Sequence, residues 1–246
     1  MTYYLRKLLF RFSICFFYST HYKAQIENND VTNQYWVDYN FTHPISDKIV
    51  LYGSTGARFV SPHIWSRYYI RHSISFTPSS TSIAGKEFII SLRTGISLFY
   101  TNNISSPNLI EISPFQGVDI KSSPNKPLQL GLYICLEERF EYTNDANDFG
   151  MRARFRFSGI LRPKNTSNQQ AIFSDLYFPM HAEIFWSFEE NSQFNDLIRI
   201  TPGIGYFATL ALKIEFSMSY FRSKNITTGD FETNDLVFRL RLFHDF

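Results

Sequence analysis

Apolar and polar residues alternate along most of the chain, most clearly in the last thirteen residues. One face of this segment is apolar and consists of Leu236, Phe238, Leu240, Leu242 and Phe246. Val237, Arg239 and Arg241 fall on the other face, because successive side chains of a strand point to opposite sides. A final strand with an apolar face, guanidinium groups on the other face and a terminal Phe is typical of outer-membrane β-barrels.

The same period of two recurs through the chain, interrupted by clusters of Asn, Ser, Pro and Gly. It predicts eleven strands, over residues 34–43, 48–60, 64–76, 87–101, 108–121, 128–142, 149–162, 174–188, 196–207, 210–222 and 235–246. Bacterial single-chain barrels have an even number of strands, because both termini lie on the periplasmic side. We therefore predict an all-β fold: one antiparallel up-and-down transmembrane β-barrel over residues 34–246, with twelve strands, or ten as the alternative.

The N-terminus has the pattern of a secretion signal. Arg6, Lys7 and Arg11 are followed by a short apolar run over residues 12–18. We predict a signal peptide over residues 1–24, cleaved after Ala24, and a polar periplasmic lead-in over residues 25–33. No later segment has the roughly 18 consecutive apolar residues that a membrane helix needs.

The composition fits a barrel with an apolar outer surface. Aromatic residues make up 18% of the chain, with 26 Phe and 15 Tyr, which suits belts at two membrane interfaces. We predict such belts from Trp36, Trp65 and Trp186 together with Tyr35, Tyr39, Tyr68, Tyr69, Tyr100, Tyr206 and Tyr220. The net charge of +2 indicates no nucleic-acid partner. Cys135 is the single cysteine after the leader, so no disulfide is expected within the mature chain.

Charged residues gather on the polar faces, and arginine predominates. If the chain turns near Asp145 and Ala146, Glu137 lies roughly opposite Arg154, and Arg139 roughly opposite Arg152. The predicted network of the barrel lumen comprises Glu137, Arg139, Glu141, Arg152, Arg154, Arg156, Glu183, Arg199, Arg239 and Arg241. The same face elsewhere carries Arg58, Arg67, Arg71, Arg93, Glu111, Asp119, Lys121, Lys213 and Glu215.

This network has two interpretations. Interleaved Arg and Glu side chains could fill the interior and satisfy one another, or the cationic excess could line a pore or pocket for anions. The first is favoured, because a barrel of about ten to twelve strands is close to the size that side chains can fill.

The sequence has no motif of a known catalytic or metal site: no Gly-x-Ser-x-Gly, His-Glu-x-x-His or Cys-x-x-Cys. His181 and Glu183 lie two apart on one polar face and could form an acid/base or metal pair. Membership of the charge network is the favoured interpretation of both. We predict no metal and no cofactor.

Several segments resemble a bacterial outer-membrane family, domain-of-unknown-function family 2490. They include an early strand with Trp36, the residues 111–115 (EISPF), 136–140 (LEERF), 151–154 (MRAR), 182–185 (AEIF) and 197–206 (LIRITPGIGY), and the final Phe246. The resemblance covers most of the mature chain. It implies an outer-membrane barrel with no assigned activity and no catalytic residues.

The leading hypothesis is therefore a non-enzymatic outer-membrane β-barrel that acts as a narrow pore, a ligand-binding barrel or a structural protein of the envelope. Its expected partners are outer-membrane lipid and the barrel-assembly machinery, which would read the C-terminal strand through Phe246. One alternative is an outer-membrane enzyme that modifies lipid or lipopolysaccharide, and would need Ser, His and a carboxylate at one rim. The other is a soluble lipocalin-like barrel that binds an apolar ligand inside.

Overall fold

The structure is a computed structural model. It describes residues 32–61, 65–78, 80–83, 86–104, 106–123, 127–144, 146–163, 175–188, 197–224 and 231–246. The predicted signal peptide over residues 1–24 lies outside the described residues, as does the predicted lead-in up to residue 31. Within the described residues, no helix has the length and apolarity needed to cross a bilayer.

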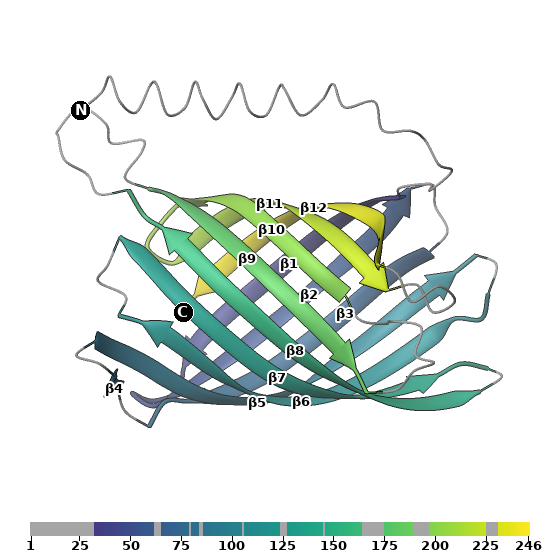
Figure 1. The fold of residues 1–246 in the computed structure, drawn as a ribbon, viewed down its shortest axis with the longest axis horizontal. Helices are drawn as coiled ribbons and strands as arrows, with labels where there is room; N and C mark the ends of the chain where they lie inside the picture. Colours follow the sequence, from purple (N-terminus) through teal and green to yellow (C-terminus); the bar gives the residue numbers. More distant parts are fainter. Residues whose placement is uncertain are drawn as a thin grey trace, which may run out of the picture. The chain divides into compact units, whose positions relative to one another are not determined.

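The described residues form twelve strands in chain order (Figure 1). They are β1 (Thr32–Pro44), β2 (Ile49–Ser61), β3 (Trp65–Phe76), β4 (Ser80–Ile83), β5 (Lys86–Asn103), β6 (Leu109–Ser122), β7 (Leu128–Tyr142), β8 (Asn147–Leu161), β9 (Leu176–Ser187), β10 (Leu197–Phe207), β11 (Leu212–Lys224) and β12 (Phe231–Asp245). Apart from β4, which was not predicted, and the start of β12 at Phe231 rather than at residue 235, these bounds agree closely with the eleven predicted strands, because alternation marks each strand and turn-forming residues end it.

The strands close into a barrel of eleven. Neighbours along the chain pair antiparallel from β1 to β3 and from β5 to β12, and β3 pairs with β5. The ring is completed by β1 and β12, which pair in parallel from Thr32–Asp235 to Thr42–Asp245. The short β4 pairs with β5 alone, and extends the ladder of β3 along the same edge of that strand. Figure 1 shows the long strands curling round to enclose an interior.

The total of twelve strands matches the predicted number, but β4 lies outside the closed ring, which has eleven strands rather than the predicted twelve or ten. An even count follows if the first and last strands pair antiparallel. Here they pair in parallel, which closes a sheet equally well because a parallel ladder also satisfies the backbone groups of both strands. β1 also starts at Thr32, so residues 32 and 33 of the predicted lead-in belong to the barrel.

The parallel pair puts the two ends of the barrel chain at opposite rims. β1 starts at Thr32 beside the start of β12, and both strands end at the rim that carries Phe246. The N–H of Phe246 donates to the carbonyl of Thr42 at 2.9 Å, which ties the last residue to the end of β1. The two rims are called the Thr32 rim and the Phe246 rim below.

A disulfide across the closing pair is expected to form in the folded barrel. Val37 and Leu240 are Cα partners, and both side chains are exposed on the outer face. In a Cys135→Ser background, Val37→Cys with Leu240→Cys should oxidise to one cross-link, seen as a mobility change of the unfolded chain on a gel. Val37→Cys with Phe216→Cys is the control, since β12 lies between them and the distance of about 10 Å is too long for a disulfide. Equal cross-linking of both pairs would contradict the closure.

The two faces of the sheet differ sharply in chemistry. On β9, Met180, Ile184 and Trp186 are 59%, 45% and 60% exposed, while the alternate residues Glu183 and Phe185 are 4% and 6% exposed. The same alternation runs around the ring, so one apolar set faces outward on every strand. The buried set of the inner face is dominated by Arg, Glu, Asp, Ser and aromatic residues.

Candidate functional site

The hairpin of β7 and β8 places Glu137, an acid at the centre of the interior, next to Arg152. Thr143 donates its N–H to the carbonyl of Ala146 at 2.9 Å, so Tyr142 pairs with Asn147. Glu137 therefore lies opposite Arg152, and Arg154 lies opposite Cys135. The predicted pairing of Glu137 with Arg154 and of Arg139 with Arg152 is offset by two residues, because the turn is centred one residue earlier than expected.

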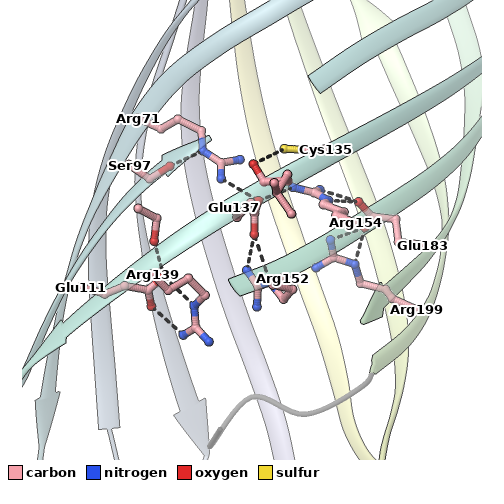
Figure 2. A network of polar contacts seen from close by, with 12 residues as sticks. Arg71, Ser97, Glu111, Cys135, Glu137, Arg139, Arg152, Arg154, Glu183 and Arg199 are labelled. Carbon is pink, nitrogen blue, oxygen red and sulfur yellow. Dashed lines mark hydrogen bonds and ion pairs between the residues drawn. The ribbon is translucent and has the colours of Figure 1, made fainter. Parts of the chain in front are cut away.

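Glu137 is the hub of the middle of the barrel, as Figure 2 shows. It is 1% exposed, and three arginines from two strands, β3 and β8, reach it. Arg152 donates from Nε at 3.0 Å, Arg71 from Nη2 at 3.3 Å, and Nη1 of Arg154 lies at 3.7 Å. Separating these strands would leave the buried charge of Glu137 unpaired, which is energetically costly. The contacts therefore fix the relative positions of β3, β7 and β8.

A second hub is Glu111 of β6, which is 2% exposed. Arg139 donates to it in a fork, from Nε at 3.1 Å and from Nη2 at 3.0 Å. Arg67 of β3 also pairs with Glu111, and the hydroxyl of Ser113 donates to it at 2.6 Å. Arg139 pairs with Glu141 as well. The fork is the geometry in which a planar guanidinium binds a carboxylate best.

Glu183 of β9 is the third hub. Arg154 donates to it from Nε at 3.0 Å, Arg199 of β10 pairs with it, and Nε of Arg156 lies 3.5 Å away. Arg154 therefore bridges Glu137 and Glu183 and joins two hubs into one network (Figure 2).

Two further acids complete the set. Asp38 of β1 pairs with Arg239 and accepts a hydrogen bond from the hydroxyl of Tyr69 at 2.6 Å. Glu215 of β11 pairs with Arg241 and accepts from the hydroxyl of Tyr177 at 3.2 Å. All ten predicted network residues thus lie in these ion pairs. Asp38 was missed because it belongs to the alternation Gln34, Trp36, Asp38, in which only the last is charged.

Arginine exceeds acid in this interior. Among the described residues, nine arginines are in ion pairs with six carboxylates: Arg67, Arg71, Arg139, Arg152, Arg154, Arg156, Arg199, Arg239 and Arg241 with Asp38, Glu111, Glu137, Glu141, Glu183 and Glu215. Arg58 and Arg93 are inside too and have no acid partner among these residues. The guanidinium carbon of Arg58 instead lies 4.2 Å from the ring centroid of Trp36.

The interior is drier toward the Thr32 rim. Trp36, Phe221 and Val237 pack there as an apolar cluster. Many inner residues of this half are at most 9% exposed: Gln34, Trp36, Val60, Arg67, Phe99, Glu111, Arg139, Arg199, Phe221 and Val237. The side chains of Arg152 and Glu141 in the same half are 19% and 15% exposed. Toward the Phe246 rim the side chains of Arg156, Lys213 and Lys121 are 28%, 23% and 54% exposed. The more exposed cationic side chains of the interior therefore lie toward the Phe246 rim, whereas Tyr133, Tyr177 and Glu215 of the same half are 6%, 5% and 4% exposed.

The predicted interfacial belts need one correction. Trp36 and Tyr69 are 5% and 8% exposed and lie inside the barrel, where they cradle Arg58. Tyr35, Tyr68 and Trp186 do lie outside, at 49%, 47% and 60% exposed. Because side chains alternate along β1, Trp36 shares the inner face with Asp38, whereas Tyr35 lies on the outer face.

The remaining candidates form no catalytic or metal arrangement. Glu183 is occupied by arginines, and Nδ1 of His181 has no hydrogen-bond partner, so the two do not form an acid/base pair. Cys135 is a buried free thiol. Within the described residues, no group of three or more His, Cys, Asp or Glu could hold a metal ion.

Phe246 lies at the rim on an aromatic cluster. Its ring centroid is 4.0 Å from that of His244 and 6.3 Å from that of Phe41, and the residue is 62% exposed. Phe246 is thus held at the rim by its backbone hydrogen bond and by its aromatic neighbours, and most of the residue stays exposed.

Comparison with known proteins gives a family and no activity. The model of the family described as "Protein of unknown function (DUF2490)" matches residues 33–232. This confirms the resemblance drawn from the sequence. No curated protein matches the chain.

Proposed function

We propose that this chain, which belongs to the DUF2490 family of unknown function, is a non-enzymatic outer-membrane β-barrel whose interior is closed by its Arg/Glu network, and not an open pore. The observation that carries the proposal is that the distribution of polar and apolar side chains is the reverse of that in a water-soluble barrel. Acids and guanidinium groups are buried inside, and large apolar side chains are exposed outside on all eleven strands of the ring.

The outer surface supports a membrane environment. It includes Val37, Phe59, Ile70, Leu98, Ile110, Ile134, Phe157, Met180, Ile200, Phe216 and Leu240, each at least 38% exposed. A monomer in water rarely exposes a continuous apolar band of this extent. The lipocalin-like alternative requires an apolar interior, and the inner face here is charged instead.

The interior supports closure. Glu111 and Glu137 are 2% and 1% exposed. In a water-filled channel such carboxylates would be solvent-exposed. Chains of bidentate and shared ion pairs run from β3 to β10 across the ring. The apolar cluster of Trp36, Phe221 and Val237 adds a second barrier near the Thr32 rim.

Membrane assembly would proceed through the C-terminal strand. The apolar face of β12 and the exposed ring of Phe246 are features that the barrel-assembly machinery could recognise. Outer-membrane lipid would then cover the apolar band. Fractionation of the native host tests this: we expect recovery in the outer membrane with a folded gel band that shifts on boiling. Recovery as a soluble periplasmic protein would refute the proposal.

Arg154→Ala separates a closed barrel from a pore. Arg154 bridges two hubs, so its loss should lower the free energy of unfolding by about 1–3 kcal/mol, since each acid keeps other arginines. We expect the wild type and the variant both to be non-conducting in planar bilayers. Arg162→Ala, at an exposed site beyond β8, is the matched control and should leave stability unchanged. Unchanged stability of Arg154→Ala with altered anion conductance would favour the pore.

A further inference from the structure

Arg93 and Arg156 lie in the half of the interior toward the Phe246 rim and have spare hydrogen-bonding capacity; the side chain of Arg156 is 28% exposed. Arg93 of β5 has no ion pair or hydrogen bond with the described residues. The one acid near Arg156 of β8 is Glu183, 3.5 Å from Nε, and that same oxygen already accepts from Arg154. Neither Nε has a hydrogen-bond partner.

Two tyrosine rings hold these guanidinium groups in place. The guanidinium carbon of Arg93 lies 4.1 Å from the ring centroid of Tyr52 and 5.8 Å from that of Tyr133. The guanidinium carbon of Arg156 lies 5.2 Å from the same Tyr133 ring. A guanidinium stacked on a ring keeps its N–H groups directed along its own plane, where they can donate to the oxygens of an anion.

His181 extends this group on the neighbouring strand. Arg156 pairs in register with Glu183, and Ser158 pairs with His181, so Arg156 and His181 are diagonal neighbours on the inner face. Nδ1 of His181 has no hydrogen-bond partner. We call Tyr52, Arg93, Tyr133, Arg156 and His181 the basic arc.

The charge around the basic arc is positive. Asp119 is the acid paired in register with Tyr133, and its charge is matched by Lys121, whose Nζ lies 2.8 Å away. Glu183 is shared among Arg154, Arg156 and Arg199. The positive charges of Arg93 and Arg156 are therefore left largely uncompensated by the protein.

We propose that the basic arc binds a small solute through an oxyanion group, a phosphate or a carboxylate, entering from the Phe246 rim. The apolar cluster of Trp36, Phe221 and Val237 lies toward the opposite rim, so the solute would enter and leave at the same end. Two stacked guanidinium groups and one imidazole supply donors of the kind that recognise oxyanions. This inference rests on the inner face alone and holds whether or not the barrel is in the outer membrane.

Isothermal titration of inorganic phosphate into the full chain, folded in dodecylmaltoside micelles, tests the site. Ionic strength is held constant with sodium chloride. We expect saturable binding to the wild type and a loss of about tenfold or more in affinity for Arg93→Gln and Arg156→Gln, since each removes charge-assisted hydrogen bonds.

Arg58→Gln is the matched control. Arg58 is also stacked on an aromatic ring and also lacks an acid partner, but it lies toward the Thr32 rim, away from the basic arc. It should bind phosphate as the wild type does. Arg93→Lys keeps the charge and the fold if Arg93→Gln fails to fold, and should still bind more weakly because it has lost the fork. Absence of saturable binding to the wild type, undiminished affinity in the folded Arg93 variants, or an equal loss in Arg58→Gln would overturn the proposal.

Discussion

Replacing Glu137 with glutamine is expected to lower the free energy of unfolding of the barrel by about 3–5 kcal/mol. Glu137 is 1% exposed and is shared by Arg71, Arg152 and Arg154. Glutamine keeps the volume of the side chain, so the change isolates the charge. Arg71 and Arg152 then lose their acid, and Arg154 keeps Glu183 alone.

Urea unfolding of the micelle-folded protein, followed by tryptophan fluorescence, measures this change. Glu138→Gln is the control, because it makes the same substitution one residue further on, on the outer face of the same strand. We expect it to alter the free energy of unfolding by less than about 0.5 kcal/mol. If the two variants unfolded at the same urea concentration, the network would not be the source of stability inferred from its geometry.

Gly95→Ala is expected to destabilise the barrel by about 3 kcal/mol, or to prevent its folding. A Cβ atom at Gly95 would lie 2.3 Å from the carbonyl oxygen of His72 and 2.6 Å from Cβ of Ser73, both on β3. It would also lie 2.7 Å from the ring of Phe115 on β6. Because the first obstacle is backbone, β3 must move away from β5, and this breaks the ladder that continues the ring.

Gly159→Ala makes the identical change where there is space. Its Cβ would meet a single atom, Cδ2 of Leu130, at 3.9 Å, which is an ordinary contact. This variant should be neutral or stabilised by about 0.4–1 kcal/mol, since alanine restricts the unfolded chain more than glycine does. The fraction of folded, heat-modifiable band on a gel compares the two. A similar loss in both variants would show that glycine matters at these sites for another reason.

The sequence predicts the strands well because a barrel strand faces two very different environments. Each residue is either outside or inside, and the alternation of Leu and Phe with Arg and Glu records this directly. The same logic identified the ten network residues as one face. It also indicated that Arg93, Arg156 and His181 share that face, although nothing in their spacing singles them out.

The partners within the network could not be predicted, because they depend on how strands are tilted and staggered. Glu137 reaches Arg71 on β3, which is not a neighbour of β7 in the ring, and Arg67 of β3 reaches Glu111 of β6 across β5. Long arginine side chains make such contacts possible. A shift of one residue in the β7–β8 turn also changed every predicted cross-strand pair of that hairpin.

The odd number of strands in the closed ring could not be predicted for a similar reason, since nothing local to β1 or β12 reports the direction of its partner. That parallel pair has a consequence for how the barrel folds. Every other neighbouring pair in the ring is close along the chain, with only the short β4 between β3 and β5, and can form locally. Tyr39 and His244, 205 residues apart, meet at 3.1 Å only when the ring closes. Closure joins the most distant parts of the sequence, so it bears the largest loop entropy and should be the slow, final step. Until then, β1 and β12 each present an unpaired edge that another chain can occupy.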